Sequence, residues 1–175
     1  MRPQGPSHPL TSVLALVLLL TGGCASYHLG PSSGLEAGAQ SITIHPFPNQ
    51  TPEPRLAPAL AGALREQIQS DGTFVLNTRN EGDLVMSGNI IDYRRIGLTF
   101  QPNDIITIRD FEIQMTAEVR VVNRRTGDLV MEQNVTGRTL IRAFDDLASA
   151  ERQALPLLSE DLARRAVDLL VDGDW

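Results

Sequence analysis

The sequence predicts an α/β fold of the α+β type: a two-layer sandwich in which two helices cover one face of a mixed four- to five-stranded sheet. Two stretches repeat apolar residues at helical spacing, and several others alternate or cluster apolar residues as strands do. One sheet face is enough to bury both helices, so we expect the other face to stay open. Residues 41–175 are long enough to form a single domain with its own core.

The first half of this domain predicts a strand, a helix and a second strand. Residues 41–45 alternate as a strand does and are stopped by Pro46. Residues 54–69 predict a helix, with Pro58 tolerated in its first turn. Its apolar stripe is Leu56, Leu60, Leu64 and Ile68. Because 74–76 is a second short strand, the order favours a parallel pair with a right-handed crossover.

The second half predicts antiparallel hairpins. Residues 84–93 are apolar enough for a strand, and an irregular segment containing Gly97, Pro102 and Asn103 follows. Residues 129–139 predict the last strand. The order of elements is therefore β-α-β-β-β-β-α, or one strand fewer if 74–76 is only a turn.

The clearest strand pattern lies in residues 108–122. Apolar residues alternate there with polar ones, which predicts one buried and one wet face. The apolar set is Phe111, Ile113, Met115, Ala117, Val119 and Val121. The wet set includes Glu112, Gln114, Thr116 and Glu118. The turn at 123–128 then completes a hairpin.

A second helix is predicted from about Leu147 to Val171. Asp145 or Asp146 is suited to cap its start and Gly173 to end it. Pro156 lies inside and should bend the helix or mark a restart. The apolar face of this helix is Leu155, Leu158, Leu162, Ala166 and Leu169.

Cys24, the only cysteine, ends a short apolar run. Residues 10–20 are too short to cross a membrane, which requires roughly 20 apolar residues, but they suit the core of a secretory signal. Arg2 precedes them, and Gly22 and Gly23 supply small residues before a cut. We therefore predict that 1–23 is a cleaved signal peptide.

Cys24 would then begin the mature chain and carry the covalent diacylglycerol and N-acyl lipid of a lipoprotein. Thr21 departs from the usual Leu, Val or Ile three residues before such a cysteine. Ala25, in place of a retaining Asp, favours the outer membrane, on its periplasmic side. Residues 24–40 form a lipidated N-terminus and tether rich in small residues.

The composition argues against a nucleic-acid partner. Without Arg2 the mature chain has 14 basic residues, all arginine, against 21 acids, and such a charge repels phosphate backbones. Gly30-Pro31-Ser32-Ser33-Gly34 matches a hydrolase nucleophile pattern, but it lies in the tether rather than on a strand-turn-helix. His28 and His45 lack metal-ligand spacing. We predict no catalytic residue, no metal site and no further cofactor.

Three segments together resemble the lipopolysaccharide-assembly lipoprotein family, LptE. They are Cys24-Ala25-Ser26-Tyr27-His28-Leu29, Ile42 through Thr51 (Ile-Thr-Ile-His-Pro-Phe-Pro-Asn-Gln-Thr) and Leu84 through Tyr93 (Leu-Val-Met-Ser-Gly-Asn-Ile-Ile-Asp-Tyr). The closing helix, with Glu151 through Leu155 and Asp161 through Ala163, is similar as well. Ser26 stands where the family usually has Gly.

The resemblance implies a non-enzymatic protein that sits inside the outer-membrane β-barrel LptD as a plug and helps to pass lipopolysaccharide into the outer leaflet. Lipopolysaccharide is anionic, so the candidate contacts are Arg94, Arg95, Arg138 and Arg142, near strand ends. Strand alternation sends Arg94 and Arg95 to opposite faces. The alternative is an outer-membrane lipoprotein that activates a peptidoglycan synthase or forms part of a secretion complex. The sequence disfavours a further alternative, a lipid-anchored hydrolase, because the context of a catalytic triad is absent.

Overall fold

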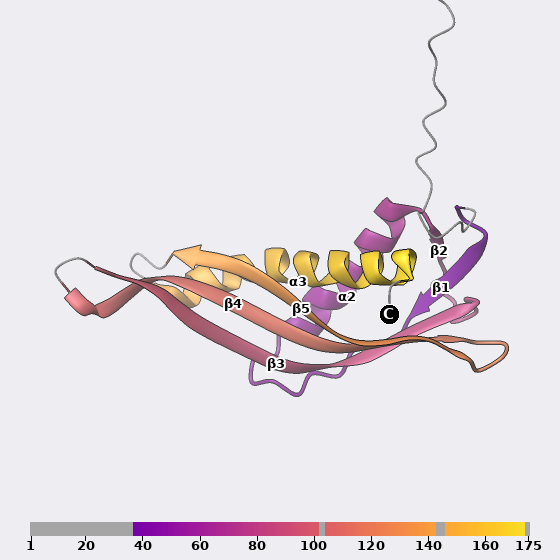
Figure 1. Cartoon of the computed structure of the whole chain (residues 1–175), viewed down its shortest axis with the longest axis horizontal. Coiled ribbons are helices and arrows are strands. Elements are labelled where there is room, and N and C mark those ends of the chain that lie inside the picture. Colours follow the sequence, from indigo (N-terminus) through magenta and orange to yellow (C-terminus); the bar gives the residue numbers. More distant parts are fainter. Residues whose placement is uncertain (1–36, 102–103, 143–145, 174–175) are drawn as a thin grey trace, which may run out of the picture.

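Two helices lie along one face of a curled five-stranded sheet (Figure 1). The computed structural model describes residues 37–101, 104–142 and 146–173, with the backbone alone at 99–101 and 104–109. The sheet order is β2-β1-β3-β4-β5. The strands are β1 (Gln40–Ile44), β2 (Phe74–Leu76), β3 (Leu84–Gln101), β4 (Asp104–Asn123) and β5 (Leu129–Arg142), and the helices are α2 (Leu56–Asp71) and α3 (Leu147–Asp172). The predicted fold class is confirmed.

The first strand, helix and second strand form the expected parallel unit. β1 pairs in parallel with β2 on one side and with β3 on the other. Helix α2 begins and ends two residues later than predicted, and Pro58 lies in its first turn as expected. Gly72 ends the helix with φ of +77°, and its N–H donates to the carbonyl of Ile68 at 3.2 Å. This left-handed conformation is accessible to glycine at little cost.

The alternation predicted for the long strand is confirmed. Ile113, Met115, Ala117, Val119 and Val121 are all fully buried beneath the helices. Strand β4 is paired on both sides, antiparallel to β3 and to β5, so its inward residues set the register of the whole three-stranded region.

The hairpin arms are longer than the sequence predicted. The prediction of an irregular segment after residue 93 is wrong, because β3 continues to Gln101 and pairs with β4 along its length. Gly97 stands opposite Phe111 inside the ladder, and small register shifts beyond it absorb the irregularity. Likewise β4 begins at Asp104 and β5 runs on to Arg142. Cross-strand pairing, which a single strand's sequence does not reveal, overrides the local breaker signals.

Helix α3 is one continuous helix, and Pro156 lies inside it without a restart. The Asp146 carboxylate caps its start by accepting from the N–H of Ala148 at 2.9 Å, and Gly173 ends it with φ of +69°. Asp145 lies outside the described residues. Within the described part of the chain, neither helix is long and apolar enough to span a membrane.

Helix α3 approaches β5 closely at Gly137. A Cβ at this position would lie 2.7 Å from the carbonyl oxygen of Leu158 and 2.8 Å from the backbone nitrogen of Leu162. The Asp161 carboxylate, on the same helix, accepts from the backbone N–H of Arg138 at 3.0 Å. Burial raises the pKa of Asp161, but this N–H and the Arg165 guanidinium hold it below its usual value. The helix is thereby fixed against the edge of β5.

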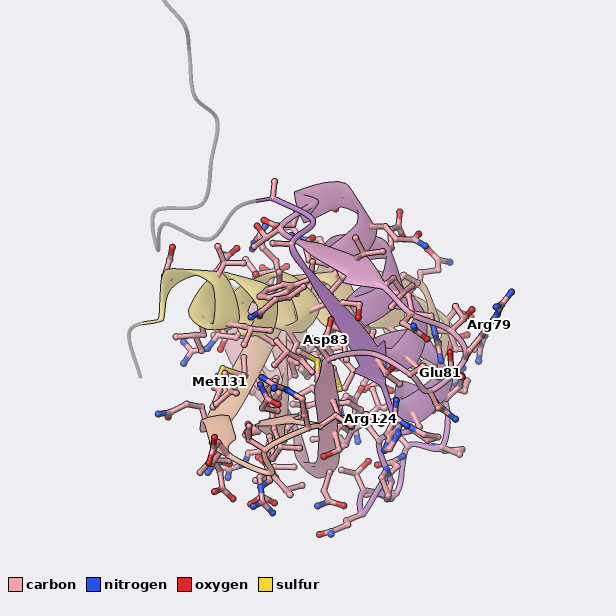
Figure 2. All side chains as sticks on the ribbon, turned by 90° about the vertical axis from the view of Figure 1, so that its right-hand side faces the viewer. Arg79, Glu81, Asp83, Arg124 and Met131 are labelled. Carbon is pink, nitrogen blue, oxygen red and sulfur yellow. The ribbon has the colours of Figure 1, made fainter. Side chains whose placement is uncertain are left out.

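Asp83 closes the end of the sheet where β1, β3 and the β4–β5 turn meet (Figure 2). Its carboxylate accepts from the backbone N–H of Ser41 at 2.9 Å and from the Ser41 hydroxyl at 2.7 Å. Its carbonyl accepts from the N–H of Arg124 at 2.8 Å. These bonds, first from the Ser41 backbone and then from its side chain, lower the pKa of Asp83. They anchor this end, while the β3–β4 arms extend from the other.

Two glycines give a matched test of these packing arguments. Gly62, in the middle of α2, has open space around it, so Gly62→Ala should stabilise the chain by about 0.5–1 kcal/mol. At Gly88 a Cβ would lie 2.0 Å from the carbonyl oxygen of Glu118 and 2.5 Å from the Phe47 ring, so Gly88→Ala should destabilise by about 1–3 kcal/mol. Urea unfolding of the full-length chain in mild detergent measures both. Equal effects of the same sign would contradict the packing described.

Candidate functional site

The sheet face away from the helices carries no second layer of helix or strand in the described structure (Figure 1), and we call it the open face. Its cross-strand rows follow from the register. The rows, each from β3 through β4 to β5, are Ser87, Arg120 and Glu132; Asn89, Glu118 and Asn134; Asp92, Thr116 and Thr136; Arg94, Gln114 and Arg138; and Ile96, Glu112 and Leu140. The predicted wet set of β4 therefore lies on this face.

A β-bulge sets which side chains of β3 reach the open face. Ile90 pairs with Ala117 and the next pair is Asp92 with Thr116, so Ile91 is an extra residue in β3. An extra residue reverses the alternation beyond it. Arg94 consequently lies on the open face, and Tyr93 and Arg95 lie on the helix side.

Two of the four predicted arginines are brought together in one row. Arg94 and Arg138 flank Gln114, whose amide donates to the Glu112 carboxylate. They are two strand spacings apart, or about 10 Å between backbones, which long arginine side chains can bridge to reach one anion. Arg138 also lines a groove of about 430 Å³ between β5 and α3.

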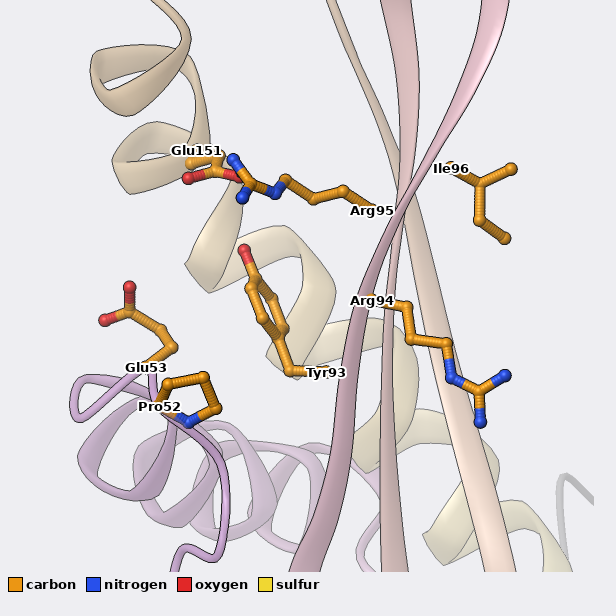
Figure 3. Close-up of a pocket in the computed structure, with 7 residues that line it drawn as sticks. All are labelled: Pro52, Glu53, Tyr93, Arg94, Arg95, Ile96 and Glu151. Atoms are coloured by element: carbon orange, nitrogen blue, oxygen red, sulfur yellow. The ribbon is translucent and has the colours of Figure 1, made fainter.

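The other two predicted arginines lie elsewhere. Arg142 pairs with Asp110 at the end of β5, on the same face but beyond the Leu140 row. Its pKa is raised by the hydrogen bond to Asp110. Arg95 points to the helix side, where its Nη1 lies 3.0 Å from the Glu151 carboxylate of α3 (Figure 3). The predicted opposite orientation of Arg94 and Arg95 is confirmed.

Two of the open-face arginines, Arg94 and Arg142, are held by acids but remain in contact with solvent. Arg94 Nε lies 2.5 Å from Asp92 Oδ2 with its side chain 68% exposed, and Arg142 Nε lies 2.5 Å from Asp110 Oδ1 with its side chain 60% exposed. Exposed pairs of this kind contribute only about 0–1 kcal/mol. An anionic group can therefore replace the carboxylates at small cost.

Apolar side chains stand beside these arginines. Ile96 is 41% exposed and Leu140 69% exposed, and they flank Glu112 in the next row. Large apolar residues so exposed, next to basic ones, form a surface suited to an amphiphile that carries both phosphates and hydrocarbon. The sequence analysis missed these two, because neither interrupts its strand pattern.

A second feature that the sequence did not predict is a cleft of about 540 Å³ on the helix side of β3. It brings Tyr93 of β3 together with Glu53, before α2, and Glu151, in the first turns of α3 (Figure 3). Burial, and then the nearby Glu151 and Glu53 carboxylates, raise the pKa of Tyr93 to about 12. No sequence pattern links residues this far apart along the chain.

The remaining candidates carry no site in the described structure. Cys24, His28 and the Gly30–Gly34 pattern lie outside the described residues. His45 is exposed, and no group of three or more potential metal ligands occurs among the residues described.

Comparison with known proteins identifies the family. The family model LptE, lipopolysaccharide assembly, matches residues 39–172. The chain belongs to the LptE family. This makes it a bacterial envelope lipoprotein of a non-enzymatic family that acts, in broad terms, in lipopolysaccharide assembly. No curated protein matches the sequence.

Solved structures share the fold of this LptE family member. A protein from Xanthomonas campestris superposes with a TM-score of 0.61 at 8% identity, covering 82% of this chain and 90% of that one. A hypothetical protein from Chlamydia trachomatis gives 0.55 at 10% identity, covering 78% and 98%. A candidate lipoprotein from Caulobacter crescentus gives 0.52 at 13% identity, covering 75% and 87%. At these identities the likeness establishes the fold alone.

The raised pKa of Tyr93 predicts an alkaline dependence. Because the folded pKa of about 12 exceeds the ordinary 10.0, the folded state holds this proton more tightly. Its contribution to stability is fully present below pH 10 and is lost as the pH rises toward 12. The difference in phenolate absorbance between the wild type and Tyr93→Phe should therefore show a transition near pH 12. A transition near pH 10 would contradict the burial of this hydroxyl.

Proposed function

We propose that this chain is the lipid-anchored partner of the outer-membrane β-barrel LptD, that it plugs the barrel, and that it helps to pass lipopolysaccharide into the outer leaflet. Membership of the LptE family supports the process. The observation that carries the proposal is the open face, a long polar sheet surface without a covering layer in the described structure. A plug must offer hydrogen-bonding groups to a barrel lumen, and this face does so over five rows.

The anchor in this proposal is a diacylglycerol and an N-acyl chain on Cys24, after removal of residues 1–23. Each buried methylene contributes about 0.8 kcal/mol, and two or more chains make attachment stable. Attachment would hold the domain on the periplasmic side of the outer membrane. The tether before β1 would allow it to enter the barrel.

Within this proposal, Arg94 and Arg138 are the phosphate contacts. Arg142 lies on the same face beyond the Leu140 row, and Arg95 pairs with Glu151 on the helix side. Charge-assisted hydrogen bonds contribute about 1.5–3 kcal/mol each, which exceeds the contribution of the exposed pair that Arg94 makes with Asp92. Ile96 and Leu140, in the next row, are placed to meet hydrocarbon.

The lipid anchor gives the first test. Cys24→Ala should block lipid attachment and leave an uncleaved or unanchored exported form, because no helix in the described structure could hold the membrane in its place. Metabolic labelling with palmitate measures this directly. Label retained by the Cys24→Ala protein would refute the anchor.

The arginine row gives the second test. Arg94→Glu combined with Arg138→Glu should weaken lipopolysaccharide binding about tenfold or more, since each lost charge-assisted contact removes about 1.5–3 kcal/mol and about 1.4 kcal/mol already corresponds to a factor of ten. Residual binding should be less sensitive to salt, and LptD should still co-purify because the other four rows of the open face are unchanged. Titration with purified lipopolysaccharide at two salt concentrations measures the effect.

The matched control is Arg124→Glu combined with Arg125→Glu. It makes the same change of charge in the exposed turn that follows β4, away from the arginine row, so it should leave binding within about twofold of the wild type. If both double variants bind alike, the open-face row is not the phosphate contact. Co-purification of a peptidoglycan synthase instead of a barrel would overturn the proposed function itself.

A further inference from the structure

The cleft on the helix side of β3 contains polar groups that the fold does not satisfy. We call it the Tyr93 cleft, and the residues that line it are Pro52, Glu53, Tyr93, Arg94, Arg95, Ile96 and Glu151. Figure 3 shows the Tyr93 hydroxyl and the Arg95 guanidinium directed toward Glu151, whereas Arg94 and Ile96 leave on the other side of the strand. The Tyr93, Arg95 and Glu151 side chains thus form the helix side of the cleft, and Arg94 and Ile96 are the lining residues that it shares with the open face. Its volume, about 540 Å³, falls in the range of small-molecule sites.

Two buried atoms of this cleft have no hydrogen-bond partner within the described structure. They are the hydroxyl oxygen of Tyr93 and Oε1 of Glu151. Arg95 Nη1 lies 3.0 Å from the same Glu151 oxygen and so balances its charge, but the contact lacks hydrogen-bond geometry. Buried polar atoms are nearly always hydrogen-bonded. A ligand that both donates and accepts would satisfy this pair.

The charges around the cleft narrow the class of ligand. Glu53 is engaged by Arg55, which donates from Nε at 2.7 Å and from Nη2 at 2.9 Å. The hydrogen bond from Arg55 lowers the pKa of Glu53, so this carboxylate is ionised at neutral pH. Glu151 is balanced by Arg95. A phosphate would meet two carboxylates and an ammonium would meet two guanidiniums, so a neutral ligand fits best.

We propose that the Tyr93 cleft binds a neutral saccharide unit, whose hydroxyls donate to Glu151 and exchange hydrogen bonds with the Tyr93 hydroxyl. Adjacent sugar hydroxyls donate and accept at neighbouring atoms, as this pair of groups requires. The flat face of the Tyr93 ring offers apolar contact to the C–H face of a sugar.

This proposal rests on the proposed function only for the source of the sugar, which is the saccharide part of lipopolysaccharide. From Asp92 onward, the outer edge of β3 has no strand partner in the described structure. Arg94 and Tyr93 are consecutive residues on opposite sides of that edge. One large glycolipid can therefore place phosphate against the open face and sugar in the Tyr93 cleft.

The test uses the full-length chain in detergent and two neutral probes: a β-1,6-linked N-acetylglucosamine disaccharide and a heptose monosaccharide. Both lack phosphate and acyl chains. Saturation-transfer NMR and titration should show saturable binding of at least one probe. Tyr93→Phe, which keeps the ring, and Glu151→Gln, which keeps the shape, should each weaken that binding roughly fivefold, as expected for one lost hydrogen bond. Inorganic phosphate should not compete.

Failure of this proposal and failure of the proposed function give different results. Arg138→Glu alone should leave probe binding unchanged, because Arg138 lies on the open face and does not line the cleft. Probe binding that is lost in Tyr93→Phe, with lipopolysaccharide binding insensitive to the arginine pair, would support the cleft and overturn the phosphate row. Absence of saturable binding of either probe, or equal binding by the wild type and both cleft variants, would overturn the cleft.

Discussion

The alternation of apolar and polar residues along β4 is the constraint on which the rest of this structure depends. β4 is the middle strand of the long antiparallel region and is paired along most of its length with β3 on one side and with β5 on the other. Its inward side chains form the floor beneath α3 and its outward ones form the middle of the open face. A shift by one residue would expose Ile113 and Met115 and bury Glu112 and Gln114. The cost of burying those polar groups without partners fixes the register, and with it every cross-strand row.

The bulge at Ile91 decides which side chains of β3 join the candidate site on the open face. The Ile90 side chain points to the core. Without the extra residue, every second residue after Ile90 would also point to the core, and Arg94 would face the helices. With it, Arg94 joins Gln114 and Arg138 on the open face, while Tyr93 and Arg95 close against α3. One inserted residue thus creates both the arginine row and the Tyr93 cleft. Bulges commonly redirect side chains near functional sites in this way.

Sequence patterns predicted much of the fold but only part of the candidate site. The helical stripes, the Asp146 and Gly173 caps and the β4 alternation are local signals, and the structure confirms them. The sequence did not predict that β3 continues past residue 93, because a glycine such as Gly97 occurs both in loops and in paired strands. The sequence predicted that Arg94 and Arg95 diverge but not which faces the helices, because that depends on the bulge. Glu151 meets Arg95 only through tertiary packing.

Two arginines of the open face, Arg94 and Arg142, form ion pairs with acids, and this affects how an anion could be released as well as bound. Arg94 is oriented by Asp92 and Arg142 by Asp110, yet both guanidiniums remain mostly exposed. A phosphate that displaces the carboxylate gains a stronger contact but leaves the acid beside it, so the net gain is smaller than for an isolated arginine. Binding is therefore favourable without being tight at any one position. A surface that must receive a lipid and then release it needs this balance, and alternating acids and arginines along one sheet face provide it.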